Sequence, residues 1–305
     1  MSLSPSAFDF VRQLVRREAA IVLEPGKEYL VEARLIPLAR AAGAGTVDDY
    51  VAGLRCTPDL TACARVVDAL TTNETSWMRD NEPFQALVSD VPPAILSSRT
   101  SDRTLQVWSA ACSSGQEPYG LATLLGEPLT AAGWQYSLLA TDISQEMLDR
   151  AQAGTYSQLE MNRGLPAAML VKHFTRTGTS WQVNPELRRH MRFKRVNLAA
   201  PFPPGLPRFD VVFLRNVLIY FDGATKRSIL ERMRTALRPE GYLFLGGAET
   251  TLGIDEGWER VKIGRSFAHR PKTGAAGETD ADSTADEADA ATTSPYDAQR
   301  RGELT

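Results

Sequence analysis

Several polar side chains of this 305-residue chain stand next to short apolar runs, where they could bind a ligand. Carboxylates bind ammonium groups or accept hydrogen bonds from hydroxyls, guanidinium groups pair with carboxylates, and amide side chains both donate and accept. The residues that match this description are Glu117, Asp142, Asn197, Arg215 and Asn216. Because a sheet of parallel strands collects such side chains at one edge, the elements that carry them decide whether they form a site.

The loop before Glu117 is made almost entirely of small residues. The apolar run 105–108 predicts a buried strand, and Glu117 with Pro118 predicts a helix start, since acidic residues and proline are both favoured in a first turn. Residues 110–115 between them would let a bound molecule approach the backbone closely. They include one glycine and no phosphate-binding Gly-x-x-x-x-Gly-Lys pattern, so an ordinary strand-to-helix turn is the alternative.

Asp142 follows the second predicted strand, at residues 136–141. An acidic residue in this place of an α/β unit is well suited to accept hydrogen bonds from ribose hydroxyls. It could instead cap a helix predicted at residues 145–153, and one side chain could not fully do both. We favour ribose binding because the small-residue loop lies at the same predicted edge of the sheet.

Strands and helices alternate over residues 104–271, which predicts an α/β domain with a largely parallel sheet covered on both faces. The run 209–214 is apolar on both faces and is therefore predicted as a central strand. Between residues 172 and 196 the alternation is interrupted by a predicted hairpin at 174–183, which turns at Gly178, and by a further strand at 191–196. We assign both to a small antiparallel β insertion.

Residues from about 6 to 69 show only helical patterns and predict a separate all-helical domain, to which we assign residues 1–85. One stripe of its second predicted helix carries Tyr29, Ala33, Ile36 and Arg40. Its arginines, Arg34 and Arg40 among them, form either a solvated face or a docking surface for an acidic protein. A linking helix and loop are expected at 86–103. The acidic tail 272–305 has few large apolar residues and is expected to be disordered.

A run of hydrogen-bonding side chains at residues 71–80, which we call the polar knot, follows the last of these predicted helices. It contains Asn73, Thr75 and Arg79. Threonine, asparagine and serine are the usual N-cap residues of helices, so a capped turn is one interpretation of the polar knot. The other is that it forms part of a ligand site.

The composition excludes several classes of protein. A net charge of −3 and a pI near 5.8 argue against nucleic acid as the main partner. Three cysteines without CxxC spacing suit a reducing cytoplasm rather than a disulfide framework or a zinc site, and three scattered histidines make a metal site improbable. The sequence has no signal peptide pattern and no apolar stretch long enough to enter a membrane, so we expect a cytoplasmic protein.

Three stretches in combination, at residues 107–119, 141–144 and 215–222, resemble the CheR family of chemotaxis-receptor methyltransferases. The resemblance covers roughly residues 8–271. It implies a Rossmann-like domain that binds S-adenosylmethionine (SAM), with a small antiparallel β insertion and a preceding all-helical domain. It also implies a monomeric enzyme that needs no metal, methylates glutamates in the cytoplasmic helical region of chemoreceptors, and releases S-adenosylhomocysteine (SAH).

The resemblance further implies roles for individual residues. Around SAM it places Asn73, Thr75, Arg79, Glu117, Asp142, Asn197, Leu198, Arg215 and Asn216. Glu117 would pair with the methionine ammonium group and Asp142 with the ribose diol, while Asn197 and the backbone at Leu198 would read the adenine edge. From its charge we hypothesise in addition that Arg79 orients the substrate carboxylate by a charge-assisted hydrogen bond. Tyr220 would lie near the transferred methyl group; its alternative role is a buried ring with a satisfied hydroxyl.

The sequence also departs from the family pattern. Trp77-Met78 stands where two phenylalanines are usual, which we expect to change packing rather than chemistry. The second helix keeps Arg34 and Arg40 for receptor docking but has Pro37-Leu38 where relatives have further arginines. The hairpin looks shorter than in relatives that grip a receptor pentapeptide, so no pentapeptide tethering is expected.

Two other functions remain open at this stage. The same SAM site could serve a different signalling protein or a small-molecule acceptor. The chain could also be a SAM-sensing scaffold that transfers no methyl group, although it retains Arg79, Asn216 and Tyr220.

Overall fold

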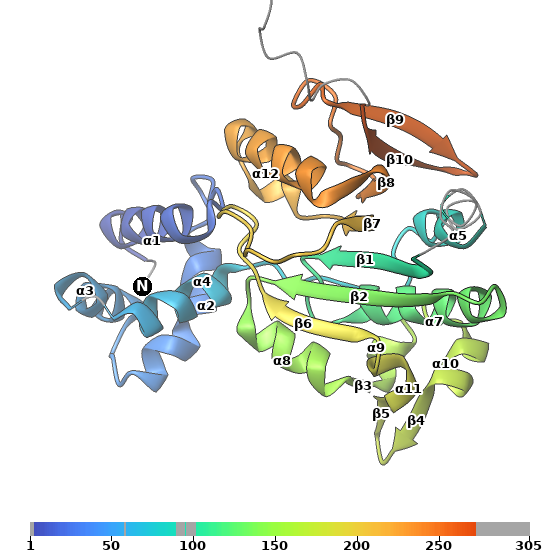
Figure 1. The fold of residues 1–305 in the computed structure, drawn as a ribbon. Coiled ribbons are helices and arrows are strands. Elements are labelled where there is room, and N and C mark those ends of the chain that lie inside the picture. Colours follow the sequence, from blue (N-terminus) through green and yellow to red (C-terminus); the bar gives the residue numbers. More distant parts are fainter. Residues whose placement is uncertain (1–2, 58, 90–94, 96–101, 273–305) are drawn as a thin grey trace, which may run out of the picture. The chain divides into compact units, whose positions relative to one another are not determined.

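Seven strands in the described part of the chain pair into one sheet in the order β6-β2-β1-β7-β8-β10-β9 (Figure 1). The structure, a computed structural model, describes residues 3–57, 59–89, 95 and 102–272, all within one compact unit that ends at Lys272. The strands are β1 Thr104–Ala110, β2 Gln135–Asp142, β6 Met191–Arg195, β7 Phe209–Leu214, β8 Leu237–Leu245, β9 Trp258–Ile263 and β10 Ser266–Pro271. Those from β6 to β8 are parallel and β10 and β9 are antiparallel, so the predictions of a largely parallel sheet and of a central strand β7 are confirmed.

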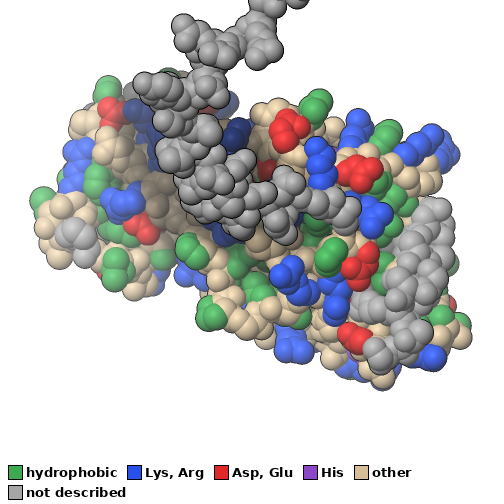
Figure 2. Space-filling view, turned by 45° about the horizontal axis from the view of Figure 1, so that its top comes forward, with side chains coloured by type: hydrophobic (Ala, Val, Ile, Leu, Met, Phe, Trp, Pro, Cys, Tyr) green, Lys and Arg blue, Asp and Glu red, His purple; other side chains and the backbone are tan. Residues whose placement is uncertain are grey.

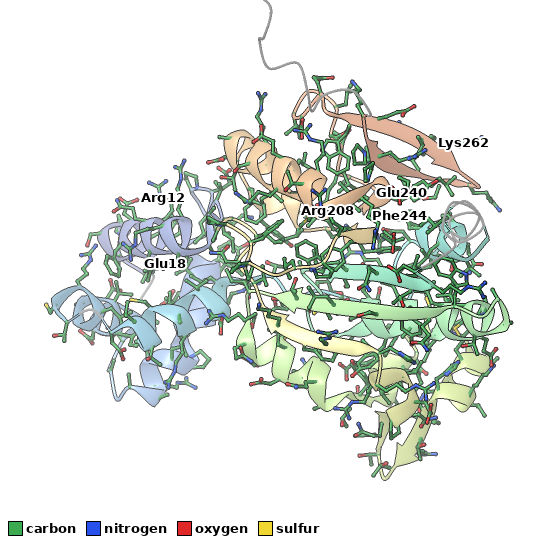
Figure 3. All side chains as sticks on the ribbon, viewed as in Figure 1. Arg12, Glu18, Arg208, Glu240, Phe244 and Lys262 are labelled. Atoms are coloured by element: carbon green, nitrogen blue, oxygen red, sulfur yellow. The ribbon has the colours of Figure 1, made fainter. Side chains whose placement is uncertain are left out.

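Helices cover both faces of this sheet because its strands alternate apolar side chains between the two faces. On one face Val107 and Phe213 pack with residues of α7 (Gln116–Ala131) and α8 (Gln145–Ala153). On the other face Trp108 and Val212 pack with residues of α12 (Gly223–Ala236). Figure 1 shows α7 and α8 on one side of the strands and α12 on the other. Phe244 of β8, labelled in Figure 3, stacks on the Phe213 ring with 4.8 Å between centroids.

Four helices form the N-terminal part of the described chain: α1 Pro5–Ala19, α2 Glu28–Ala41, α3 Val47–Cys56 and α4 Leu60–Leu70. The N-cap side chains of Ser4, Thr46 and Asp59 accept backbone N–H groups at the starts of α1, α3 and α4. The core of this bundle is apolar. Most residues of the predicted stripe of α2 do not belong to it. Tyr29, Ala33 and Arg40 lie exposed, whereas Val31, Leu35 and Ala39 are buried.

The small second sheet differs from the predicted β insertion in one strand. The hairpin is present as β4 (Phe174–Thr177) and β5 (Ser180–Val183), turning at Gly178 with φ of +61°. Its third strand is β3 (Thr155–Ser157), which no sequence pattern indicated. The strand predicted at 191–196 is β6, which pairs with β2 in the main sheet. Assigning it to the β insertion was therefore wrong, because strand pairing depends on contacts that a local pattern does not contain. The short helices α9 (Gln158–Met161) and α10 (Ala167–His173) contact this sheet, and α11 (Pro185–Arg188) contacts α7.

The segment between the helical bundle and β1 contains α5 (Glu82–Ser89). Phe84 of α5 is fully buried in the same core as β7, with 5.4 Å between the Phe84 and Phe213 ring centroids. Residues 82–85 therefore pack with the sheet. The predicted domain boundary at residue 85 assigned them to the helical bundle instead. Most of the predicted link at 86–103 and the tail from residue 273 lie outside the described residues.

On the face drawn in Figure 2, Lys and Arg side chains are interspersed with Asp and Glu. None of the helices within the described ranges is long and apolar enough to cross a membrane.

Candidate active site

One cavity brings together every residue that the sequence placed around a cofactor or at the reaction centre. Its lining includes Asn73, Thr75, Arg79, Glu117, Asp142, Asn197, Leu198, Arg215, Asn216 and Tyr220. The empty space inside the cavity and its mouth, open solvent included, is about 910 Å³. Glu117, Asp142 and Arg215 come from the carboxyl edge of the parallel strands, and Ala19 and Ile21 come from the end of α1 and the segment after it.

Asp142 lies buried at the end of β2 and receives hydrogen bonds from two loops. Its Oδ1 atom accepts the Ser144 backbone N–H at 2.9 Å, and its Oδ2 atom accepts the Ser113 N–H at 2.8 Å. Burial raises the pKa of Asp142, although these backbone N–H groups favour the charged form. The helix α8 is capped by Ser144, so the interpretation of Asp142 as an N-cap is wrong.

Glu117, in the first turn of α7, is paired with Arg215. The Glu117 Oε2 atom lies 3.3 Å from Arg215 Nη1, and Oε1 accepts the Ser109 hydroxyl at 2.7 Å. Burial raises the pKa of Glu117, while the Arg215 charge and the Ser109 hydroxyl oppose that shift. The Glu117 side chain keeps 12% of its surface exposed, on the wall of the cavity.

Arg215 has almost no exposed surface, and its two terminal Nη atoms bind groups within the protein. Its side chain is 2% exposed, and its Nη2 atom donates to the Asp80 carboxylate at 2.6 Å and to the Arg79 carbonyl oxygen at 2.7 Å. Arg215 thus joins Glu117 to the polar knot. Asp80 was not among the predicted site residues, and only its place beside Arg79 in the polar knot could have indicated it.

Arg79 differs from Arg215, whose guanidinium group is ion-paired with Glu117 and Asp80. Among the described residues it makes one long hydrogen bond, 3.4 Å from Nη1 to the Glu74 carbonyl oxygen, and no ion pair. Its side chain lines the cavity and is half-buried. The cavity therefore contains one guanidinium group that is available to an incoming carboxylate.

The polar knot is an irregular loop held in place at several points. Arg34 Nη1 donates to the carbonyl oxygens of Leu70 and Thr71 at 3.0 and 2.8 Å. The Ser113 hydroxyl donates to the Asn73 carbonyl oxygen at 2.8 Å. The half-buried Arg34 therefore supports the start of the polar knot from inside the protein, whereas Arg40 is exposed.

Trp77 connects the polar knot to the small second sheet. It is 1% exposed and meets the rings of Tyr156 and Phe174 edge-on, with centroids 5.0 and 5.3 Å apart. Its backbone N–H donates to the Arg163 carbonyl oxygen. The unusual Trp77-Met78 pair is thus a packing feature, as expected.

The side-chain amide of Asn197 is already hydrogen-bonded within the protein, which limits its ability to bind a ligand. Its Nδ2 atom donates to the Glu18 carbonyl oxygen at 2.7 Å, and its Oδ1 atom accepts the Ala199 N–H at 3.0 Å. Glu18, labelled in Figure 3, lies near the end of α1. Asn197 therefore ties the helical bundle to the cavity wall, and Leu198 beside it is buried.

Glu249 is a further residue at the site that the sequence did not indicate. Its carboxylate accepts backbone N–H groups from Asn216, Val217 and Leu218, which belong to the segment after β7. The available signal was its place four residues after the end of β8, similar to that of the other polar residues that follow strands.

Two family models match the chain. The SAM-binding domain of CheR methyltransferases matches residues 73–266, and the all-alpha domain of the same enzymes matches residues 6–71. The chain belongs to the CheR methyltransferase family. Accordingly, this CheR methyltransferase is a SAM-dependent enzyme of chemotaxis. Along the chain, its all-helical domain is followed by a Rossmann-like domain. The two family models meet near residue 72, at the start of the polar knot.

Curated relatives match this CheR methyltransferase over most of its length. It is 38% identical to chemotaxis protein methyltransferase 1 of Pseudomonas aeruginosa, over 89% of this chain and 100% of that protein. It is 36% identical to chemotaxis protein methyltransferase Cher2 of Pseudomonas putida, over the same shares of the two chains. It is 36% identical to chemotaxis protein methyltransferase 1 of Vibrio cholerae, over 87% of this chain and 96% of that protein.

No group of three or more His, Cys, Asp or Glu side chains that could hold a metal ion occurs within the described ranges of the chain. The cavity instead offers two buried carboxylates, Glu117 and Asp142, and apolar side chains such as Ile21 and Leu198. This mixture fits SAM, which carries an ammonium group, a ribose diol and a flat adenine ring.

Proposed function

We propose that this CheR methyltransferase transfers the methyl group of SAM to glutamate side chains of chemoreceptors, acting as a monomer in the cytoplasm. The products would be glutamate methyl esters and SAH. The observation that carries the proposal is the cavity, which is lined by both the helical bundle and the sheet and holds the available guanidinium of Arg79. A carboxylate substrate is the natural partner of such a group.

The residues that line the cavity suggest which part of SAM each of them would bind. Glu117 would pair with the methionine ammonium group, which supplies the positive charge that a buried carboxylate needs. Asp142 would accept the ribose hydroxyls with the lone pairs that Ser113 and Ser144 leave free. Asn73, Thr75, Asn216 and the wall at Asn197-Leu198 would surround the remainder of SAM.

The chemistry needs neither a histidine base nor a metal. A glutamate side chain, with an ordinary pKa of about 4.3, is already ionised at neutral pH, and the sulfonium of SAM is an activated methyl donor. What remains is alignment, for which effective molarities of about 10⁵–10⁸ M are available. Arg79 would hold the attacking oxygen in line, and the loss of charge on esterification would weaken that hold and release the product.

Incubating the protein with cytoplasmic fragments of candidate chemoreceptors and radiolabelled SAM tests this function. We expect base-labile label in the receptor fragment, because carboxyl methyl esters hydrolyse in base. Label in another signalling protein or in a small molecule would replace the receptor as substrate. SAM binding without label in any acceptor would favour a sensing scaffold and contradict the proposal.

We expect Arg34 and Arg40 to act differently although both lie on α2. Replacing Arg40 by alanine should raise the KM for receptor by about two- to fivefold, since an exposed charge contributes at most about 1 kcal/mol, and leave SAH affinity unchanged. Arg34→Ala should weaken SAH binding by about tenfold, because the carbonyl groups of Leu70 and Thr71, where α4 meets the polar knot, lose a charged donor. Receptor titrations and SAH calorimetry on both variants check this. Equal effects of both variants on receptor KM would show that Arg34 also belongs to the docking surface.

We expect no dependence on a receptor C-terminal pentapeptide. The β4–β5 hairpin has four residues in each strand and turns within two residues, so it offers little surface for gripping a peptide. Titrating the protein with receptor C-terminal peptides should give no binding at micromolar concentrations, and removing these residues from the receptor should leave its methylation rate unchanged. Micromolar binding would overturn this expectation.

A further inference from the structure

The Glu249 carboxylate is surrounded by four backbone N–H groups. Its Oε2 atom accepts from Asn216 and Gly246, both at 2.7 Å, and its Oε1 atom accepts from Val217 at 2.8 Å and Leu218 at 2.7 Å. Hydrogen bonds to an ionised acceptor are stronger than neutral ones. One side chain therefore fixes three consecutive residues of the segment after β7 against the segment after β8.

The segment that Glu249 holds forms a wall of the candidate active site. Asn216, Val217 and Tyr220 all line the cavity, whereas Glu249 does not. Asn216 has φ of +58°, a conformation that is uncommon for residues other than glycine and persists only where neighbouring groups enforce it. The η1 turn (Leu218–Tyr220) follows directly and has no hydrogen bond from the side chain of its own cap residue. Glu249 supplies the acceptor for this turn instead.

Gly246 provides independent evidence that this contact is closely fitted. A Cβ atom at Gly246 would lie 2.7 Å from Asn216 Nδ2 and 2.7 Å from Glu249 Oε2. It would also lie 2.9 Å from the Asn216 backbone nitrogen. Any side chain at residue 246 would thus push Glu249 away from Asn216, so the two segments have room for each other only because glycine is present.

The far end of the η1 turn is fixed as well. The carbonyl oxygen of Tyr220 accepts the Val22 N–H at 3.0 Å, which joins the turn to the segment after α1. Arg215, immediately before Asn216, pairs with Glu117 across the cavity. A shift at Asn216 would therefore be transmitted to Tyr220 on one side and to the Glu117 pair on the other.

We propose that Glu249 is a positioning residue of the methyl transfer reaction, acting through Asn216 and Tyr220. Its side chain does not line the cavity. Its carboxylate sets the backbone of the segment after β7, and this backbone sets where the Asn216 and Tyr220 side chains stand in the cavity. The effect on catalysis rests on the proposed receptor methylation, whereas the effect on backbone order and SAH binding does not.

The test is Glu249→Gln, which keeps the size of the side chain. The amide has one oxygen, so two of the four N–H groups would face an NH₂ group that cannot accept from them. We expect kcat on receptor to fall by about 100-fold, the effect of a misplacement near 1 Å, with little change in receptor KM. SAH affinity should fall, and hydrogen exchange should accelerate at residues 216–220. Glu256→Gln, which changes an exposed glutamate on the same C-terminal segment, is the matched control and should resemble the wild type.

A second variant, Gly246→Ala, disturbs the same contact and leaves the Glu249 charge in place. It should reproduce the loss of kcat and the faster exchange at residues 216–220. A purely structural role for Glu249 would lower the unfolding temperature and leave the kcat and KM of the folded fraction normal, and that result would overturn the proposal. If the wild type methylates no receptor, the proposed function fails, while SAH affinity and hydrogen exchange still decide the role of Glu249. Unchanged exchange and SAH affinity in both variants would refute it.

Discussion

Replacing Arg79 by alanine is expected to abolish methyl transfer to receptor while SAH binding, measured by calorimetry, stays close to that of the wild type. Removing a single preorganised donor that stabilises charge in a reaction typically lowers kcat by about 10²–10³-fold. Arg79 is the guanidinium of the cavity that the described residues leave available, with one hydrogen bond of 3.4 Å to the Glu74 carbonyl oxygen. Arg215 cannot replace it, because Glu117 and Asp80 already hold its charge.

The matched control for this experiment is Arg163→Ala. Arg163 also contacts Glu74, through an exposed ion pair, but does not line the cavity. An exposed pair contributes little, so this variant should methylate receptor at close to the wild-type rate. Loss of SAH binding in Arg79→Ala would assign Arg79 to the cofactor instead of the substrate. Loss of activity in both variants would mean that Glu74 and the packing of the polar knot carry the effect.

Replacing Glu117 by glutamine is expected to weaken SAM binding by about 30- to 5,000-fold, which corresponds to the roughly 2–5 kcal/mol lost when one partner of a buried charge pair is removed. In the proposed complex the Glu117 carboxylate faces the methionine ammonium group, and an uncharged amide would leave that group poorly compensated. Calorimetric titration with SAH, which carries the same ammonium group, measures the change. Glu127→Gln, near the other end of α7, removes only an exposed ion pair to Lys172 and should bind SAH normally.

The same residue predicts how SAM affinity depends on pH. Burial raises the pKa of Glu117 in the free protein, so its carboxyl group takes up a proton at a higher pH than an ordinary glutamate with a pKa of about 4.3. Only the ionised form attracts an ammonium group, so SAH affinity should fall with acidification, starting above the range of an ordinary glutamate. Burial raises the pKa of Asp142 too, so this group adds to the fall. The part due to Glu117 should be absent in Glu117→Gln, and an unchanged pH profile in that variant would contradict its role.

Local patterns in the sequence predicted most of the elements and the members of the cavity. The helical patterns near the N-terminus predicted an all-helical part of the chain, where the structure has α1, α3 and α4. Asp142 and Arg215 follow runs that are apolar on both faces, and parallel strands place their carboxyl ends at one edge. That these residues meet at one edge of the sheet therefore follows from the pattern of strands and from the connections between them. Both can be recognised from short stretches of the sequence.

Other features depended on contacts between distant parts of the chain. The sequence of α2 carries apolar residues on more than one face, so only packing against the other helices decided that Val31 and Leu35 are buried while Tyr29 is exposed. The strand β6 could have paired with the hairpin or with β2, and the packing of the whole sheet selected β2.

The hydrogen bonds that hold the site belong to this second group. Arg34 reaches carbonyl groups 36 and 37 residues away, and Glu249 reaches N–H groups 31 to 33 residues away. A carboxylate or guanidinium in a sequence has the same chemistry whether it faces water, a partner or its own backbone. The sequence by itself thus determined which kinds of group the cavity contains, because strand ends and residue types are local properties. The tertiary structure alone decided which charged side chains remain available to a ligand and which bind the protein's own backbone. This choice depends on which distant segments of the chain meet.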